Sequence, residues 1–282
     1  MIAIFATEIK YNHSVRFKIT LKVNESAFGR KLPLNYQYEL SAAIYRIFAS
    51  SDKEFATWLH RNGFHTESGY VFKLFTFSRL FPKKQQLLGQ SNQLELLSDQ
   101  VEWQIGFLPE KTTQQFIDGL FQNRMIEIGN RQSKVQFEVS GIKLLPSFEF
   151  MDSMTFDALS PISVSQKDAL GRDRYPKDGE EFKTALWVRE RMLQNLINKY
   201  EAFYGCTYEG ERRLDFEALT EPKSALVTIK ADTPQETKVR GFMCKLTLRC
   251  PEALLRIAYE CGLGEGNGQG FGCLGMTTGN KI

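Results

Sequence analysis

The sequence is short of the residue types that hold metals and disulfides. Its five cysteines stand at 206, 244, 250, 261 and 273, with no Cys-x-x-Cys spacing, and its three histidines at 13, 60 and 65. A secreted disulfide framework uses an even set of cysteines, and a zinc site uses closely spaced Cys and His ligands. We therefore expect reduced thiols, no metal site and no cofactor, which is typical of a cytoplasmic protein.

Long apolar runs and a large net charge are also missing. No stretch approaches the roughly 20 apolar residues of a membrane span, and residues 1–8 lack the basic and apolar parts of a signal peptide. The formal net charge is only +3. Residues 1–147 nevertheless hold 18 Lys and Arg against 13 Asp and Glu, whereas residues 148–282 hold 18 against 20. A polyanion would therefore be bound mainly by the first half.

Hydrophobic periodicity in the first half predicts a βαββαβ unit. Strands are predicted over residues 15–23, 72–79, 101–108 and 134–145, helices over 38–49 and 112–123, and a loop or irregular hairpin over 81–100. Ser51-Asp-Lys-Glu54 fits a capping box, which predicts a further short helix ending before Gly63 with His60 in its last turn.

The second half repeats this pattern. Strands are predicted over residues 155–165, 225–230, 239–249 and 271–277, and helices over 178–204 and 251–261. The predicted fold class is therefore α+β, with two tandem ferredoxin-like (RRM-like, βαββαβ) domains at residues 1–147 and 148–282.

Glycine is concentrated near the end of the chain, where seven glycines fall within residues 262–275, here called the glycine-rich segment. A dinucleotide-binding loop runs from strand to glycines to helix, whereas this segment follows a predicted helix. Three interpretations stay open: a mobile tail loop, a phosphate site for a nucleotide cofactor, and a cradle for the phosphates of a nucleic acid. The cradle would be formed by Gly262, Gly264, Gly266, Gly268, Gly270 and Gly272.

Four stretches occur in a recognisable order. They are Leu32-Pro-Leu-Asn-Tyr-Gln-Tyr-Glu-Leu-Ser-Ala-Ala-Ile-Tyr45 with Phe55-Ala-Thr-Trp-Leu-His60, then Phe72-Lys-Leu-Phe-Thr-Phe-Ser78, then Leu159-Ser-Pro-Ile162, and last the glycine-rich segment. Together they resemble the CRISPR-associated endoribonucleases that cut precursor CRISPR RNA, members of the repeat-associated RNA-binding superfamily. The resemblance spans almost the whole chain.

The resemblance implies two ferredoxin-like domains with repeat RNA lying across their shared cleft. It also implies cleavage without metal, in which a 2′-hydroxyl attacks the adjacent phosphorus and leaves a 2′,3′-cyclic phosphate and a 5′-hydroxyl. In the branch that this chain resembles most, the catalytic set is a Tyr, a His and a Lys. The matching residues are Tyr45, His60 and Lys73, and His65 is the competing histidine.

This set makes chemical sense because the RNA brings its own nucleophile. An imidazole transfers protons near neutral pH. A helix C-terminus favours the imidazolium form of His60, whereas burial opposes it, so acid and base roles stay open. Lys73 would neutralise charge on the phosphorane, and Tyr45 would bind a non-bridging oxygen or help activate the 2′-hydroxyl. Each residue also has a purely structural interpretation. His60 would be a histidine at a helix end, Tyr45 a half-buried packing residue, and Lys73 a solvent-facing charge on a strand.

Basic side chains on the predicted strands are candidate phosphate contacts, which hold RNA in register without reading its sequence. They are Arg16, Lys18, Lys22, Arg79 and Lys134. The first alternative is a non-catalytic repeat-RNA-binding subunit of a CRISPR effector complex, and the second is a nucleotide-dependent enzyme. The sequence leaves open whether the chain forms a homodimer or stays bound to effector subunits.

Overall fold

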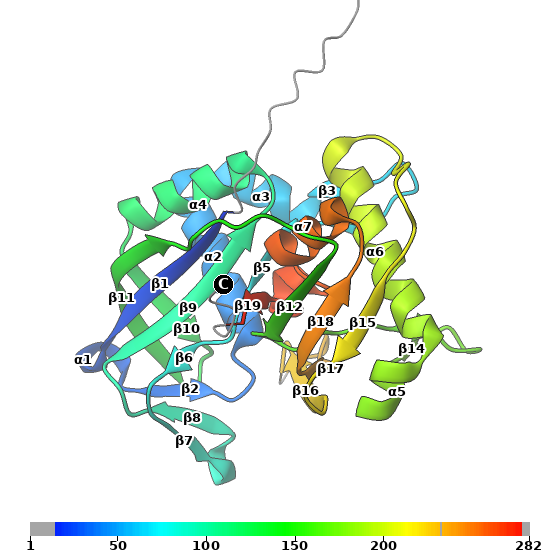
Figure 1. Cartoon of the computed structure of the whole chain (residues 1–282). Coiled ribbons are helices and arrows are strands. Elements are labelled where there is room, and N and C mark those ends of the chain that lie inside the picture. The colour runs from blue at the N-terminus through cyan, green and yellow to red at the C-terminus, as the bar shows by residue number, and fades with distance from the viewer. Residues whose placement is uncertain (1–14, 232, 278–282) are drawn as a thin grey trace, which may run out of the picture.

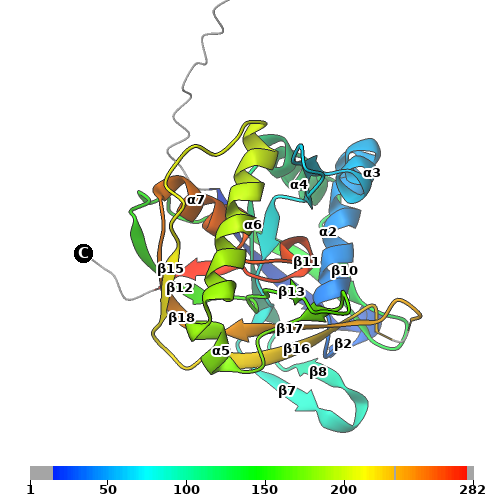
Figure 2. The same ribbon diagram turned by 90° about the vertical axis from the view of Figure 1, so that its right-hand side faces the viewer.

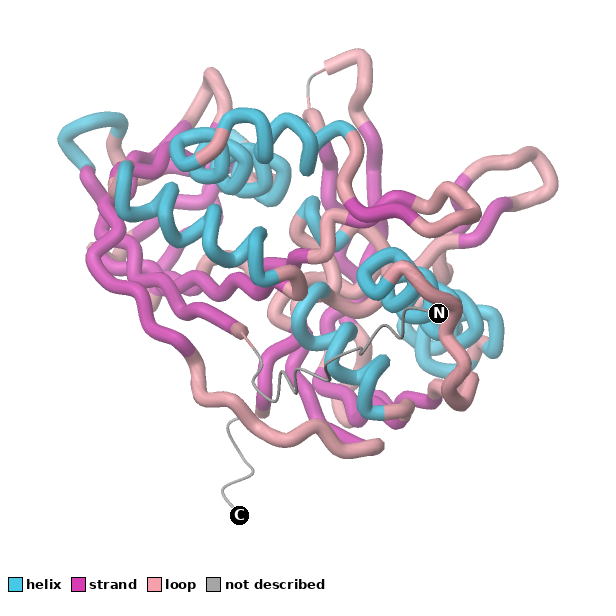
Figure 3. The backbone as a smooth tube through the Cα atoms, turned by 90° about the horizontal axis from the view of Figure 1, so that it is seen from above, coloured by secondary structure: helices cyan, strands magenta, loops and turns pink. Residues whose placement is uncertain are grey.

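The computed structural model describes residues 15–231 and 233–277. His13 and the first eight residues, which bear on a signal peptide, lie outside the described residues. The described chain forms two antiparallel sheets with helices packed against them, and these two halves lie side by side (Figures 1 and 3). This arrangement is the α+β, tandem ferredoxin-like fold that the sequence predicts.

The first sheet has the strand order β10-β11-β1-β9-β5. Its elements are β1 (Arg16–Asn24), α2 (Gln37–Ser51), β5 (Phe75–Phe77), β6 (Phe81–Pro82), β9 (Gln100–Phe107), α4 (Glu110–Gln122), β10 (Met125–Gly129) and β11 (Lys134–Leu144), with β6 pairing beside β9. Without β6 and β10, chain order gives the βαββαβ unit. β10 is an edge strand that the hydrophobic pattern did not predict.

Close packing of the two helices fixes this unit. Gly119 of α4 lies against α2 so closely that a Cβ there would stand 2.0 Å from the carbonyl oxygen of Ile47. Phe48 and Phe116 meet across the same contact, with ring centroids 5.8 Å apart. The helix that bears Tyr45 is therefore held rigidly against the first core.

The second sheet has the strand order β15-β18-β12-β19. Its elements are β12 (Ser153–Ala158), α6 (Leu186–Tyr204), β15 (Asp215–Ala218), β18 (Lys245–Arg249), α7 (Glu252–Cys261) and β19 (Leu274–Met276). Its two central strands are the first and third of the unit, as in the first half. A two-stranded hairpin, β16 (Lys223–Ile229) and β17 (Thr237–Met243), is inserted between β15 and β18.

The remaining elements are short and lie in the connections between the elements of each unit. They are α1 (Glu25–Phe28), β2 (Lys31–Pro33), α3 (Lys53–Arg61), β3 (Phe64–His65), β4 (Val71–Phe72), β7 (Gln85–Leu88), η1 (Gly89–Ser91), β8 (Gln93–Leu96), β13 (Gln166–Lys167), β14 (Asp173–Arg174), α5 (Gly179–Thr184) and η2 (Asn267–Gln269). β7 and β8 form the hairpin expected within residues 81–100 and pair with β2.

Several predicted elements are interrupted where the chain changes direction. The helix predicted over residues 178–204 is two helices, α5 and α6, because Ala185 is extended, with φ −69° and ψ 126°. The strand predicted over residues 239–249 is also two strands, β17 and β18, and the one predicted from residue 155 ends at Ala158. The N-cap of α3 is Asp52 rather than Ser51, since the Asp52 carboxylate accepts the Phe55 N–H at 2.8 Å.

The two units are joined by a buried arginine that the sequence placed wrongly. Arg16 was predicted on the solvent face of the first strand as an RNA contact, but only 1% of it is exposed. Its guanidinium donates to Cys273 Sγ at 2.9 Å and to the carbonyl oxygen of Tyr259, and it stacks 4.3 Å from the Tyr259 ring centroid. Because these partners belong to the second unit, Arg16 links the units instead of facing solvent.

The cysteines all carry free thiols, Cys206 at the surface and the other four buried. Among residues 15–231 and 233–277, none of the helices combines the length and the apolar character needed to cross a bilayer.

Candidate active site

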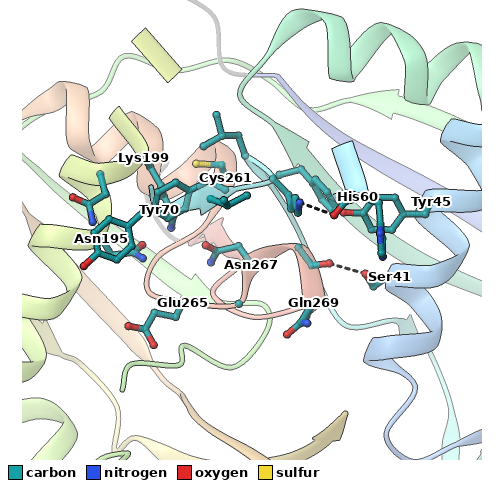
Figure 4. A pocket seen from close by; sticks show the side chains of 18 of the residues that line it. Ser41, Tyr45, His60, Tyr70, Asn195, Lys199, Cys261, Glu265, Asn267 and Gln269 are labelled. Atoms are coloured by element: carbon teal, nitrogen blue, oxygen red, sulfur yellow. Dashed lines mark hydrogen bonds between the residues drawn. The ribbon is translucent and has the colours of Figure 1, made fainter. Parts of the chain in front are cut away.

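A cavity of about 740 Å³ opens where the two units meet. Its walls come from α2 and α3, the β3–β4 hairpin, α6, and the glycine-rich segment. Figure 4 shows Tyr45 and His60 at one end, Tyr70 and Asn195 at the other, and the glycine-rich segment between them. Figure 2 shows α2 and α6 standing on either side of the C-terminal part of the chain.

Tyr45 and His60 meet at the end formed by α2 and α3. Their ring centroids are 5.1 Å apart at an interplanar angle of 81°. Tyr45 is half-buried, with its ring edge-to-face against Phe48 and Phe75, whereas His60 is exposed in the last turn of α3. The structure therefore holds the tyrosine by packing and leaves the imidazole open to the cavity.

Lys73 joins them through a break in a predicted strand. Residues 72–79 were predicted as one strand, but Leu74 has φ +52°, so the chain leaves β4 and restarts as β5. A positive φ is strained for a leucine and persists only where packing enforces it; here the Leu74 side chain is buried in the core of the second unit. The break lets Lys73 Nζ donate to the carbonyl oxygen of His60 at 2.8 Å.

Burial changes the acid–base properties of two of these side chains. It raises the pKa of the Tyr45 hydroxyl, so the phenol stays protonated at neutral pH. It lowers the pKa of Lys73, whose ammonium lies at the negative end of the α3 dipole. Tyr45 is therefore suited to donate a hydrogen bond and not to remove a proton.

Most of the glycine-rich segment is folded against the protein. The amides of Gly262, Gly270 and Gly272 already donate to carbonyl oxygens of the chain at 2.8–3.1 Å, and all three residues are buried. They have no N–H to offer a phosphate, so the prediction of a cradle that uses these three glycines is wrong. The amides serve the fold of the segment instead.

Two glycines of the segment, Gly264 and Gly272, are required by space. A Cβ on Gly272 would lie 1.9 Å, and one on Gly264 2.4 Å, from a backbone carbonyl oxygen, and both residues have positive φ. Gly264 is also buried, which leaves Gly266 and Gly268 as the members of the predicted cradle on the cavity surface. Ser41 of α2 holds this part, since its hydroxyl donates to the carbonyl oxygen of Gly268 at 2.7 Å.

A buried lysine that the sequence did not reveal supports the segment from behind. Lys199 of α6 is 2% exposed, and its ammonium donates to the carbonyl oxygens of Gly262 at 2.7 Å and Gly264 at 2.9 Å. Burial lowers the pKa of Lys199 to about 8. In the sequence, Lys199 shows only as a lysine on the apolar face of a predicted helix. A lysine whose long side chain reaches the surface gives the same pattern.

The other predicted phosphate contacts lie outside this cavity. Lys18 pairs with Glu102 and Lys134 with Glu127, each at 2.9 Å. Lys22 is exposed on β1, and Arg79 is half-buried. These strand residues therefore do not join the Tyr45 end of the cavity.

Two models of one protein family match successive parts of the chain. "CRISPR-associated protein Cas6, N-terminal" matches residues 31–143, and "CRISPR associated protein Cas6, C-terminal" matches residues 145–276. The chain belongs to the Cas6 family. Its glycine-rich segment runs from α7 to β19, so it has the helix-to-strand order that a dinucleotide-binding loop does not have.

Relatives of known sequence span nearly the same length. The chain is 26% identical over 272 residues to "CRISPR-associated endoribonuclease Cas6 1" of Methanocaldococcus jannaschii, covering 92% of this chain and 91% of that protein. It is 27% identical over 274 residues to "CRISPR-associated endoribonuclease Cas6" of Pyrococcus furiosus, covering 95% and 91%.

Solved structures of the family share the fold. A structure described as "An RAMP protein binding different RNA substrates" superposes with a TM-score of 0.74 at 25% identity, over 93% of this chain and 99% of that one. A "Cas6-related gene" product from Pyrococcus furiosus superposes with a TM-score of 0.76 at 22% identity, over 95% and 100%.

Proposed function

We propose that this Cas6-family chain is an endoribonuclease that cleaves precursor CRISPR RNA within its repeats without a metal ion. The observation that carries the proposal is the gathering of Tyr45, His60 and Lys73 at one end of a cavity beside the glycine-rich segment. The relatives named endoribonucleases support the reaction class.

The proposed reaction starts from the RNA itself. The 2′-hydroxyl attacks the adjacent phosphorus, its proton passes to solvent water, and the bond to the 5′-oxygen breaks. His60 donates a proton to that leaving oxygen, so the products are a 2′,3′-cyclic phosphate and a 5′-hydroxyl. Lys73 neutralises the charge on the phosphorane, and the protonated Tyr45 hydroxyl donates to a non-bridging oxygen.

The first experiment is cleavage of repeat RNA from the source organism in EDTA, with the product ends mapped. His60→Ala should lower the single-turnover rate by roughly 10²-fold or more, the scale of general acid–base catalysis, while RNA affinity stays near that of the wild type. His65→Ala is the matched control, because His65 is exposed on β3 and does not line the cavity.

Three results would contradict the proposal. Normal cleavage by His60→Ala would exclude His60, and loss of cleavage in His65→Ala would move the role to that residue. Loss of all cleavage in EDTA would refute a reaction without metal.

A second candidate function is a non-cleaving subunit that retains repeat RNA in a CRISPR effector complex. It is favoured by the engagement of Lys73, whose ammonium already donates to the carbonyl oxygen of His60. A relative in Pyrococcus furiosus, 26% identical over 247 residues, is named only "endoribonuclease-like". Tight binding of repeat RNA without any cut would support this function.

A further inference from the structure

The end of the cavity farthest from His60 differs in chemistry from the proposed catalytic end. It is lined by Tyr70 from the turn between β3 and β4, and by Arg191, Gln194, Asn195 and Asn198 along one face of α6. Figure 4 shows Tyr70 and Asn195 on this side, across the glycine-rich segment from Tyr45 and His60.

The charges at this end are already paired. Arg191 donates to Glu265 at 2.9 Å and to the carbonyl oxygen of Ser165 at 3.0 Å. The buried Lys199 ammonium is held by two carbonyl oxygens. A phosphate would meet the Glu265 carboxylate, and the two described cations beside it, Arg191 and Lys199, already have partners, so this end suits a neutral polar group.

Asn195 lines this end and carries an unpaired acceptor. Asn195 Oδ1 is buried and has no hydrogen-bond partner among the described residues, and such an atom costs free energy unless a ligand or water supplies a donor. Next to it, Gln194 Nε2 donates to Asn198 Oδ1 at 2.7 Å, which fixes the orientation of the Asn198 amide. Side-chain amides offer a donor and an acceptor together, as the edges of nucleobases do.

An aromatic ring completes the set. Tyr70 is 53% exposed although its backbone is fixed, because its N–H donates to Thr66 Oγ1 at 3.1 Å and its carbonyl accepts the Thr66 N–H at 3.0 Å. A rigidly held, uncovered tyrosine is a stacking platform for an unstacked base. The cavity, at about 740 Å³, has room for more than a phosphate group.

We propose that this end of the cavity is a nucleobase pocket for the nucleotide adjoining the scissile phosphate. Tyr70 stacks on the base, and Asn195 reads its hydrogen-bonding edge. The inference rests on the proposed function for the place of the phosphate at the other end. It adds a sequence-reading element to a site otherwise built for the RNA backbone.

The test uses repeat RNAs that differ only at the two nucleotides flanking the mapped cut. At each of these two positions, all four bases are compared. A 2′-deoxy sugar before the cut blocks attack, so affinity is measured without cleavage, and matching RNAs with a 2′-hydroxyl give the single-turnover rate. If the wild type makes no cut, the proposed function fails. The pocket is then tested through affinity alone, by making the same base substitutions at each position of the repeat in turn.

The two residues should leave different signatures. The wild type should prefer one base at one flanking nucleotide by roughly tenfold, and Asn195→Leu should remove that preference. Tyr70→Ala should weaken binding of all four RNAs by roughly tenfold, since every base has a face to stack. Tyr70→Phe keeps the ring and should bind like the wild type.

Tyr204→Ala is the remote control, because Tyr204 is 49% exposed on α6 and lies outside the cavity. Equal binding of all four bases by the wild type would overturn the inference. So would a Tyr70→Ala protein that binds as tightly as Tyr204→Ala.

Discussion

Lys199 offers a quantitative test of how the glycine-rich segment is held. Replacing it with methionine keeps a long side chain but removes the ammonium that bonds the carbonyl oxygens of Gly262 and Gly264. Each hydrogen bond from a charged group is worth about 1.5–3 kcal/mol. Against this, burial lowers the Lys199 pKa from 10.5 to about 8, which corresponds to a cost of roughly 3 kcal/mol below pH 8. The free energy of the two hydrogen bonds and the burial cost are similar in size, so Lys199→Met should change the free energy of unfolding little at neutral pH.

The pH dependence does not cancel in this way. Between about pH 8 and pH 10.5 the unfolded chain holds a proton on Lys199 that the folded chain has released, so the wild type gains stability as the pH rises. This gain is complete above the unfolded pKa and is lost as the pH falls through the folded pKa. Relative to Lys199→Met, the free energy of unfolding of the wild type should rise by about 2 to 3 kcal/mol between about pH 7 and pH 10.

The assay is urea unfolding of both proteins at several pH values, because their difference removes the titration of all other groups. The neighbouring Cys261 does not interfere, since burial raises the pKa of its thiol to about 12. Two profiles that stay parallel from about pH 7 to pH 10 would refute the argument that Lys199 is a desolvated ammonium. The variant should also bind repeat RNA more weakly, as the segment loses its support.

Three other substitutions separate chemistry and binding from packing. Tyr45→Phe keeps the edge-to-face contacts with Phe48 and His60 and should lower single-turnover cleavage by roughly 10²-fold with little change in unfolding free energy; an unchanged rate would make Tyr45 a packing residue only. Arg16→Ala should lower the free energy of unfolding by roughly 3 kcal/mol, because packing and hydrogen bonds are lost. It should leave the salt dependence of RNA binding unchanged. Lys22→Ala, at an exposed strand position, should instead reduce the slope of log affinity against log salt concentration by about 1. A changed slope in Arg16→Ala would restore the original assignment of Arg16.

Local patterning determined the architecture. Alternation along β1 and the helical period of α2, α4 and α7 are properties of consecutive residues, so they predicted these elements and the order of the first unit. In the second unit the strand predicted over residues 225–230 belongs to the inserted β16–β17 hairpin, and the sheet uses β15 in its place. The glycine-rich segment was also visible as a helix-to-strand connection, which is the reverse of the order in a dinucleotide-binding loop. The elements that the hydrophobic pattern missed, such as β10 and β15, are short strands whose pairing depends on a distant partner.

Tertiary structure decided the rest of the site. The same alternation that exposes Lys22 predicted exposure for Arg16, but Tyr259 of α7 and Cys273 contact its guanidinium, which is buried. The break at Leu74, which points Lys73 toward α3, depends on a side chain buried in the core of the other unit. Lys199 acquires its environment where α6 meets the glycine-rich segment, and Asn195 acquires its environment where α6 borders the cavity. Periodicity reports which face of an element is apolar, whereas burial and hydrogen-bond partners depend on segments far away in the chain.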